Sequence, residues 1–427
     1  MSSQTQFFFT IAVFIVTYVM IMFEKIHRTV LALAGGLIVI LAGIISQEKA
    51  FSSIDFNTIG LLIGMMVIVG ITRQTGVFGY LAIYAAKVAK GDPVKIMIYL
   101  STITAVVSAF LDNVTTVLLI VPVTFAVAEQ LKVSVLPFLM GEVIASNIGG
   151  TATLIGDPPN IMIGSATGLG FMDFLINLAP VIAVVFLTNM LWLYLLYRKD
   201  IVARDELKQK IMSMNEKKEI HDAVLLRQCL IVISITILGF VVHQYLHLES
   251  STIALGGAVL LLLITRHEPE HALAAVEWPV IFFFAGLFVL VGALDSVGAI
   301  EAVARKSLEL TGGAMLTTGL LVLWLSAIAS AFIDNIPFVA TMIPLIKELG
   351  QLGSITDLNP LWWALSLGAC LGGNGTLIGA SANVVVAGLA EKRGVAITFM
   401  GFTRVAFPMM LVSVLICTAY LVLFYFY

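Results

Sequence analysis

The sequence predicts an all-helical polytopic membrane protein made of two inverted-topology repeats, each with five crossings, a re-entrant hairpin and a broken helix. Three observations predict this fold. Of the 427 residues, 60% are hydrophobic and only 11% are charged, whereas a soluble domain carries roughly 25% charged residues. Many apolar runs reach the length of about 20 residues that one helix needs to cross a bilayer. Finally, motifs of the first half recur in the same order in the second.

The apolar composition extends along the whole chain, with a mean hydropathy of +1.05. It excludes a disordered protein, a coiled coil and a secreted disulfide scaffold. The formal net charge of −3 offers no basic surface, so we expect no nucleic-acid partner. The cysteines at 229, 370 and 417 are too widely spaced for a clustered metal site, and we expect no metal and no other cofactor.

The first apolar run, residues 7–23, has the position of a signal peptide. It lacks a basic segment before it and a small-residue cleavage site, so we expect a retained helix. Further runs along the chain have the length and composition of crossings. The predicted crossings are residues 7–23, 29–46, 57–72, 137–168, 171–197, 228–246, 251–265, 278–294, 361–391 and 402–426.

Two other apolar runs, residues 94–128 and 314–349, are too long for one crossing, and an Asp-Asn pair interrupts each in the middle. An Asp at the centre of a bilayer costs on the order of 3 kcal/mol. A re-entrant hairpin that turns at the pair fits better, because Asp and Asn side chains bond local backbone groups and irregular backbone survives where it lines a cavity. The alternative is that each Asp only caps a helix.

The internal repeat has a shift of about 222 residues. SAFLDN at 108–113 recurs as SAFIDN at 330–335, and GG at 149–150 with TLIG at 153–156 recurs at 372–373 and 376–379. Five crossings is an odd number, so the second repeat enters the membrane in the opposite direction. Inverted repeats are typical of secondary transporters, with the binding site near the midplane between the halves. The first repeat is predicted over 1–197, a linker over 198–227 and the second repeat over 228–427.

The orientation follows from the basic residues. The linker is rich in Lys and Arg, which are enriched in cytoplasmic loops. Counting outward from the linker places Lys25 and Arg28 on the cytoplasmic side too and both chain termini outside. We therefore expect a multi-pass protein of the cytoplasmic (inner) membrane, in contact with membrane lipid.

The glycine-rich motifs NIGGTATLIGDPPN at 147–160 and GGNGTLIGASAN at 372–383 predict two broken helices. Broken ends offer free N–H groups to anionic or hydroxylated ligands and free carbonyl groups to cations. The alternative is a glycine-rich packing interface, which is common in membrane bundles. The candidate substrate-binding residues are Asn113, Thr115, Gly150, Thr151, Thr153, Asn160, Asn335, Gly373, Asn374, Gly375, Thr376 and Asn383.

Three carboxyl groups are candidates for proton coupling, namely those of Asp112, Asp334 and Asp157. Burial favours the protonated form of a carboxyl, so such a group can exchange a proton near neutral pH. Glu142, five residues before Asn147, is a weaker candidate because it could face water at the cytoplasmic mouth.

At these motifs the chain resembles the ion transporter superfamily. That group contains ArsB-type arsenite permeases, NhaD-type sodium/proton antiporters, the melanosomal P protein and sodium-coupled dicarboxylate symporters. LDNVTTV at 111–117, together with GGTATLIGDPPN at 149–160, is most similar to the ArsB and P-protein branch. The resemblance implies a scaffold domain, a transport domain and elevator-like alternating access. Many members are homodimers and some arsenite permeases recruit a cytoplasmic ATPase, so both are candidate partners.

The resemblance also bears on the substrate. In the dicarboxylate branch, Ser-Asn-Thr hairpin tips hold substrate carboxylates and flank sodium sites. Here the tips read DNVT at 112–115 and DNIP at 334–337, so an Asp replaces the Ser. A negative tip repels a dicarboxylate and suits a proton or a cation.

We therefore expect a small inorganic substrate and a proton-coupled exporter of arsenite and antimonite. Arsenous acid is neutral and rich in hydroxyls, so Asn, Thr and backbone groups can bind it without a compensating charge. The alternatives are a sodium/proton antiporter, with sodium as the coupling ion, and a sodium-coupled anion transporter. A membrane-embedded enzyme would need a catalytic set at membrane depth, and no histidine lies in the middle of a predicted crossing.

Overall fold

The structure is a computed structural model that describes residues 2–23, 25–353, 355 and 357–426. Within these ranges the regular secondary structure is helical throughout, which confirms the predicted all-helical class. The helices before the linker are α1 (Ser3–Met22), α2 (Arg28–Leu41), α3 (Gln47–Ser52), α4 (Phe56–Arg73), α5 (Val77–Val88), α6 (Pro93–Ser108), α7 (Asn113–Leu131), α8 (Leu136–Thr151), α9 (Pro158–Thr167) and α10 (Phe171–Tyr197).

The linker carries a short helix, α11 (Asp205–Ser213), and a 3-10 turn, η1 (Glu216–Glu219). The second repeat then follows the first one element for element. Its helices are α12 (Ala223–Val242), α13 (Ser250–Thr265), α14 (Pro269–Leu273), α15 (Trp278–Ser296), α16 (Ala299–Thr311), α17 (Met315–Phe332), α18 (Asn335–Leu352), α19 (Asn359–Gly372), α20 (Ser381–Lys392) and α21 (Phe399–Phe424).

Eight helices of the described chain have at least 18 residues and are apolar enough to cross a membrane. Six of the eight are predicted crossings, and the other two, α7 and α17, belong to the predicted hairpins. The other four of the ten predicted crossings are shorter or divided, for two reasons. Helices α2 and α13 have only 14 and 16 residues. The predicted crossings 137–168 and 361–391 are each divided into two shorter helices by a break.

Each Asp of an Asp-Asn pair caps the second helix of its hairpin. The Asp112 carboxylate accepts a hydrogen bond from the Thr115 N–H at 2.8 Å, and Asp334 accepts one from the Ile336 N–H at 3.1 Å. The capping interpretation and the hairpin interpretation are therefore both correct, because the chain reverses at the residue that caps the returning helix.

The breaks between α8 and α9 and between α19 and α20 depend on glycine. A Cβ atom on Gly150 would lie 2.5 Å from the Gly156 carbonyl oxygen, and one on Gly379 would lie 2.7 Å from that of Gly373. The first break ends at Pro158, at the start of α9, where a missing backbone N–H costs no hydrogen bond. The two ends of each break can thus lie against each other only without side chains.

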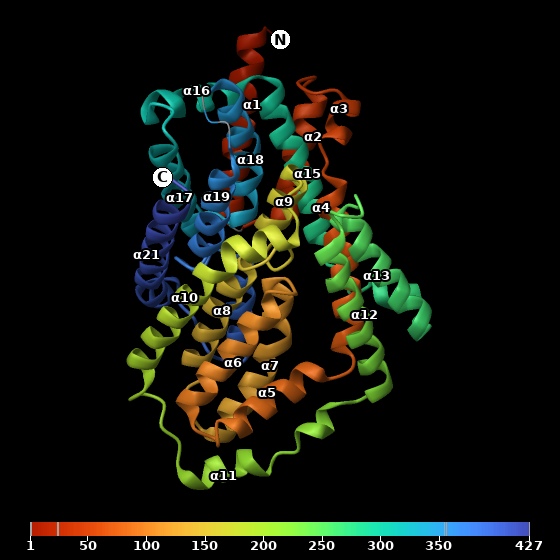
Figure 1. Ribbon diagram of the computed structural model, residues 1–427, viewed down its shortest axis with the longest axis vertical. Coiled ribbons are helices and arrows are strands. Elements are labelled where there is room, and N and C mark those ends of the chain that lie inside the picture. Colours follow the sequence, from red (N-terminus) through yellow and green to blue (C-terminus); the bar gives the residue numbers. More distant parts are fainter. Residues whose placement is uncertain (1, 24, 354, 356, 427) are drawn as a thin grey trace.

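The helices form two groups; in Figure 1, α2, α4, α12, α13 and α15 of one group lie on the right, and α8, α10, α17, α19 and α21 of the other lie on the left. We call α1, α2, α4, α12, α13 and α15 the frame bundle, and α6–α10 with α17–α21 the hairpin bundle. In the frame bundle, helices of different repeats cross closely, α4 on α13 and α2 on α15. Gly64 and Gly286 permit these crossings, since a Cβ would lie 2.5 Å and 2.6 Å from the facing backbone.

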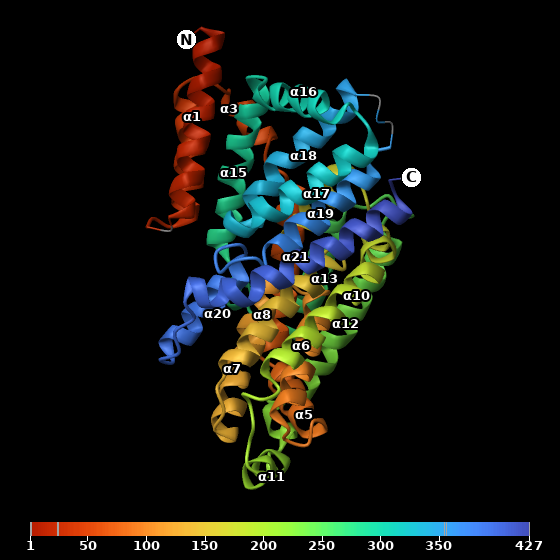
Figure 2. The same cartoon turned by 90° about the vertical axis from the view of Figure 1, so that its left-hand side faces the viewer.

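The hairpin bundle repeats one arrangement twice. Helix α6 packs on α8, and α17 packs on α19. The Ser108 hydroxyl donates to the Ser146 carbonyl at 2.7 Å, and the Ser330 hydroxyl donates to that of Ala369 at 2.6 Å. The linker and α5 lie at one end of the molecule and α3 and α16 at the other, so the two hairpins approach the middle from opposite ends (Figures 1 and 2).

Candidate functional site

An amide network joins the two repeats where the hairpin tips meet. The Asn113 amide donates to Asn147 Oδ1 at 2.9 Å. The Asn147 amide in turn donates to Asn374 Oδ1 at 2.9 Å and to Asn383 Oδ1 at 3.0 Å. All four side chains are buried. Because Asn147 belongs to the first repeat and two of its partners to the second, it links the first hairpin tip to the second broken helix.

Asn160 and Asn383 hold the two breaks in shape. The Asn160 amide donates to the carbonyls of Thr151 and Thr153 at 3.1 and 2.9 Å, and the Asn383 amide donates to those of Gly373 and Thr376 at 2.8 and 2.9 Å. Each Asn thereby satisfies carbonyls that a helix end leaves free. Their side-chain oxygens accept bonds from the opposite repeat, Asn160 from the Ser366 hydroxyl at 2.5 Å.

The threonines of the glycine-rich motifs also bond to backbone. Thr153 donates to the carbonyl of Ala109, and Thr376 donates to that of Ala331, so each break is tied to the turn of its own hairpin. Thr151 donates to the Asn147 carbonyl at 2.7 Å. In this conformation these hydroxyl groups hold the framework of the site.

A small cavity lies between the hairpin tips, the first break and the frame bundle. We call it the junction cavity, and its volume of about 20 Å³ is close to that of one water-sized probe. Of the residues predicted for the site, it is lined by Asp112, Asn113, Asp157 and Asn335. The other polar or charged side chains that line it are Arg28, Glu277 and Ser381.

Asp157 is the most unusual group of the junction cavity. The side chain is fully buried, and its Oδ1 accepts one bond, from the Asn335 amide at 3.3 Å. Its Oδ2 has no hydrogen-bond partner. Asp112, by contrast, accepts both from the Thr115 N–H and from the Thr115 hydroxyl at 2.5 Å. A buried carboxylate oxygen without a partner is costly unless it binds a proton or another cation.

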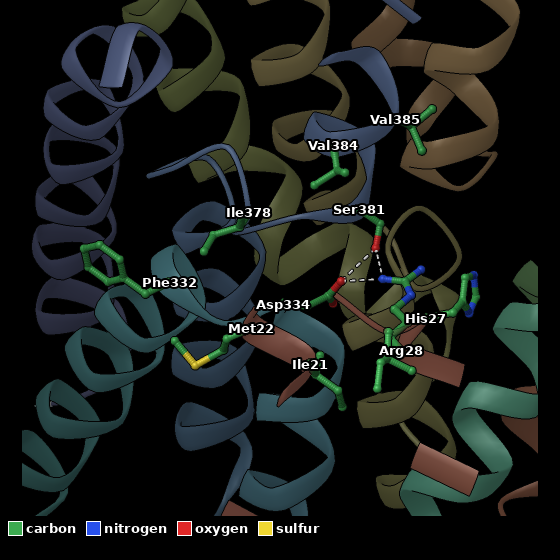
Figure 3. A pocket seen from close by; sticks show the side chains of 11 residues that line it. Ile21, Met22, His27, Arg28, Phe332, Asp334, Ile378, Ser381, Val384 and Val385 are labelled. Atoms are coloured by element: carbon green, nitrogen blue, oxygen red, sulfur yellow. Dashed lines mark hydrogen bonds and ion pairs between the residues drawn. The ribbon is translucent and has the colours of Figure 1, made fainter. Parts of the chain in front are cut away.

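A larger cavity of about 240 Å³ adjoins the second hairpin tip; we call it the side cavity (Figure 3). Three polar side chains point toward one another at its wall. Arg28 Nη1 donates to Asp334 Oδ2 at 2.7 Å and to Ser381 Oγ at 2.5 Å, and the Ser381 hydroxyl donates to Asp334 at 2.8 Å. The guanidinium also lies 5.1 Å from the centre of the Phe283 ring. Most of the remaining lining is apolar.

Arg28 and Ser381 line both cavities, so this cluster forms the boundary between them. Arg28 belongs to the frame bundle, whereas Asp334 and Ser381 belong to the hairpin bundle. Together the two cavities carry four acidic side chains and one arginine. The lining therefore favours a proton, a cation or a neutral solute over an anion.

The predicted site residues thus separate into two sets. Asp112, Asn113, Asp157, Asn335 and Asp334 line the two cavities. The other predicted residues support the framework around them, by side-chain hydrogen bonds or, for the glycines, by close backbone approach. This second set is Thr115, Gly150, Thr151, Thr153, Asn160, Gly373, Asn374, Gly375, Thr376 and Asn383.

The sequence reasoning missed Arg28 and Glu277 as site residues. Arg28 was assigned to a cytoplasmic loop, but it is the first residue of α2 and contacts the second hairpin tip. Glu277 precedes α15 at the position that matches Asp55 in the first repeat, at the shift of 222. That shared acidic position was a signal for Glu277. A basic residue at the start of an apolar run was the corresponding signal for Arg28.

Glu142 corrects a second expectation. It does not face water, because its side chain is fully buried in α8, and its Oε1 accepts a hydrogen bond from the Thr124 hydroxyl at 2.5 Å. Among the described residues, no group of three His, Cys, Asp or Glu side chains could hold a metal ion.

Comparisons with known proteins agree with a transporter. Residues 18–368 match the model of a family described as citrate transporter. An uncharacterized transporter of Mycobacterium tuberculosis is 44% identical over 421 residues, which cover 97% of this chain and 98% of that protein. The human P protein is 37% identical over 503 residues, covering 98% of this chain and 60% of that protein.

A solved structure shares the fold. The YdaH transporter of Alcanivorax borkumensis, described as having an unusual topology, superposes with a TM-score of 0.59 at 14% sequence identity. The match covers 87% of this chain and 86% of that one. At this level of identity the likeness concerns the fold alone.

Proposed function

The chain belongs to the citrate transporter family (CitMHS) of the ion transporter superfamily, and on the basis of the lining of its cavities we propose a secondary transporter that exchanges protons for a small inorganic solute. Arsenite and antimonite are the first candidates for that solute, and export by proton antiport is the proposed direction. The observation that carries the proposal is the acidic junction cavity with the unpartnered oxygen of Asp157.

The charge of the site supports an uncharged or cationic solute. Four carboxyl groups, those of Asp112, Asp157, Glu277 and Asp334, line the two cavities, and Arg28, which pairs with Asp334, supplies the single guanidinium. A free tricarboxylate such as citrate would be repelled, because like charges at short range in a protein interior interact strongly. Arsenous acid meets no such barrier, since its hydroxyl groups can bond to carboxyl and amide groups without a change of charge.

Alternating access of the elevator type fits the two bundles. The site lies where the frame bundle meets the hairpin bundle, and the junction cavity, with a volume of about 20 Å³, has room for only about one water-sized molecule in this conformation. Entry and release of a solute then require the hairpin bundle to move against the frame bundle. Coupling arises because protonation and solute binding have different affinities in the two states.

Sodium/proton antiport is the second candidate, favoured by the size and chemistry of the junction cavity. Its lining offers carboxylate and amide oxygens, which are the ligands that hard cations prefer, around a space suited to a single ion. In that case Asp157 would bind the proton and the sodium ion in turn.

Uptake into everted membrane vesicles under an imposed pH gradient tests these proposals. Arsenite, sodium and citrate are offered separately, to the wild type and to Asp157→Asn, Asp112→Asn and Asp334→Asn. We expect arsenite accumulation that a protonophore abolishes and that Asp157→Asn removes. Glu129→Gln, on the exposed face of α7, serves as the matched control and should transport normally.

Each alternative has its own result. Sodium-dependent proton release without arsenite movement would replace the metalloid by sodium. Citrate accumulation driven by protons or sodium would contradict the charge argument. Unchanged arsenite transport in all three Asp variants would refute the role of the acidic cavity.

A further inference from the structure

A second buried acid lies inside the hairpin bundle, outside both cavities. Glu142 of α8 has no exposed surface. Its Oε1 accepts one short hydrogen bond, from the Thr124 hydroxyl of α7 at 2.5 Å, and its Oε2 has no partner. One hydrogen bond does not replace the water that an ionised carboxylate loses on burial, so the neutral acid is the stable form here.

In the described part of the chain, no charged side chain pairs with Glu142. Helix α8 packs against α6, α7, α10, α19 and α20, and none of the charged side chains on these helices makes an ion pair or hydrogen bond with Glu142. Among the described residues these charged side chains are Lys95, Glu129, Asp173, Glu391 and Lys392, while α19 carries only the thiol of Cys370. When Glu142 loses its proton to another group, no positively charged side chain is therefore in place to stabilise the ionised carboxylate.

Polar groups are spaced along α7 between Glu142 and the junction cavity. Thr116, Ile120 and Thr124 recur every four residues of α7, which places them on one face of the helix. The Thr124 hydroxyl also lies 3.3 Å from the Ile120 carbonyl, and the Thr116 hydroxyl is buried without a partner. Asn113, which lines the junction cavity, is less than one turn from Thr116. The row thus leads from the hairpin tip to the acid.

The second repeat shows that the fold does not need these polar groups. At the shift of 222 residues, Thr116 and Thr124 correspond to Phe338 and Ile346. In the next helix the shift is 223, which aligns Pro137 with Pro360 and Glu142 with Leu365. Ser101 of α6, whose hydroxyl is also unpartnered, corresponds to Leu323. The same helix packing is therefore built from apolar residues in one repeat and from a polar row in the other.

From these contacts we propose that Glu142 is a second proton-binding site of the transport cycle, separate from the solute site and connected to it along the Thr116–Thr124 face of α7. The proton leaves a hydronium ion, whose O–H bond breaks as the O–H bond to the free Oε2 of the carboxylate forms, and on release it returns from the same oxygen to water. Only the role of Glu142 in the transport cycle depends on the proposed proton-coupled transport. Proton binding itself is a property of the folded protein.

Infrared difference spectroscopy of the purified protein after a pH change tests proton binding without any substrate. The wild type should show one component of the protonated-carboxyl band that Glu142→Gln and Glu142→Leu both remove and that Asp157→Asn and the surface control Glu129→Gln both retain. Leu is the residue that the second repeat carries at this position, so this variant should fold. A protonated-carboxyl band that is unchanged in folded Glu142→Gln, or a wild type without any such band, would overturn the proposal.

Vesicle transport tests the role in the cycle. Glu142→Gln should lower proton-driven accumulation by about tenfold, a typical size for coupling between two sites, while solute-for-solute exchange stays near the wild-type rate. Equal loss of both activities, or full retention of accumulation, would overturn the role. If the wild type shows the band but moves none of the offered solutes, the proposed function fails while the proton site stands.

Discussion

Replacing Arg28 with Gln should weaken the contact between the frame bundle and the second hairpin tip. Arg28 Nη1 donates two hydrogen bonds, to Asp334 at 2.7 Å and to Ser381 at 2.5 Å. Hydrogen bonds to charged groups contribute about 1.5–3 kcal/mol. The Arg28 side chain is 27% exposed, so solvent screens the pair and the lower end of this range, about 1.5 kcal/mol, applies. This corresponds to about a tenfold change in the equilibrium constant between the closed and the open form of this contact.

The assay follows access to the junction cavity. Met66 of α4 lines that cavity and is buried, so a cysteine at this position, in a chain without its three native cysteines, reports opening. The rate at which a small thiol reagent labels Met66→Cys should rise about tenfold when Arg28→Gln is added. Arg305→Gln, which breaks an exposed pair on α16, should leave the rate unchanged. An unchanged rate in Arg28→Gln would refute the reasoning that this cluster closes the boundary between the cavities.

Other predictions concern the framework and the linker. Asn147→Ala should lower the free energy of unfolding by about 1–3 kcal/mol, because its buried amide partners lose their bonds; thermal unfolding in detergent measures this. Gly149→Ala should cost about 1–3 kcal/mol in the same assay, since its Cβ would lie 2.0 Å from a carbonyl oxygen of α6. Its control Gly256→Ala, with no atom within 4 Å, should be neutral or stabilising, and equal losses would contradict the packing argument. Finally, the hydrogen bond from Lys87 holds the pKa of Glu216 below its usual value of 4.5. The stabilisation of the linker is full above pH 4.5 and is lost as the pH falls through the lowered pKa, so proteolysis of the linker should increase there in the wild type but not in Lys87→Gln.

Much of the fold could be predicted because its signals are local. Apolar length predicts the helices, and Asp112 and Asp334 mark the hairpin turns because Asp is a strong helix cap. Glycines with the Pro158-Pro159 pair mark the breaks because these residues oppose continuous helix. The repeat of these marks at one shift then indicates two similar halves. Each signal acts within about one helical turn, which is why a linear reading finds it.

The composition of the site was decided by the tertiary structure. Arg28 and Asp334 are 306 residues apart, and Asn147 bonds to groups 227 and 236 residues away. No local pattern distinguishes Arg28 at the boundary between the cavities from an arginine at a membrane surface. Thr151, Thr153, Thr376, Asn160 and Asn383 bond to backbone carbonyls, whose positions the folded breaks and hairpins determine. The burial of Glu142 likewise depends on the helices that cover it.

By itself the sequence determined where helices begin, break and reverse, because these features depend on residues that are neighbours in the chain. Which charged groups meet in the cavities, and which are removed from water, depends on how distant helices pack, and only the tertiary structure decided that.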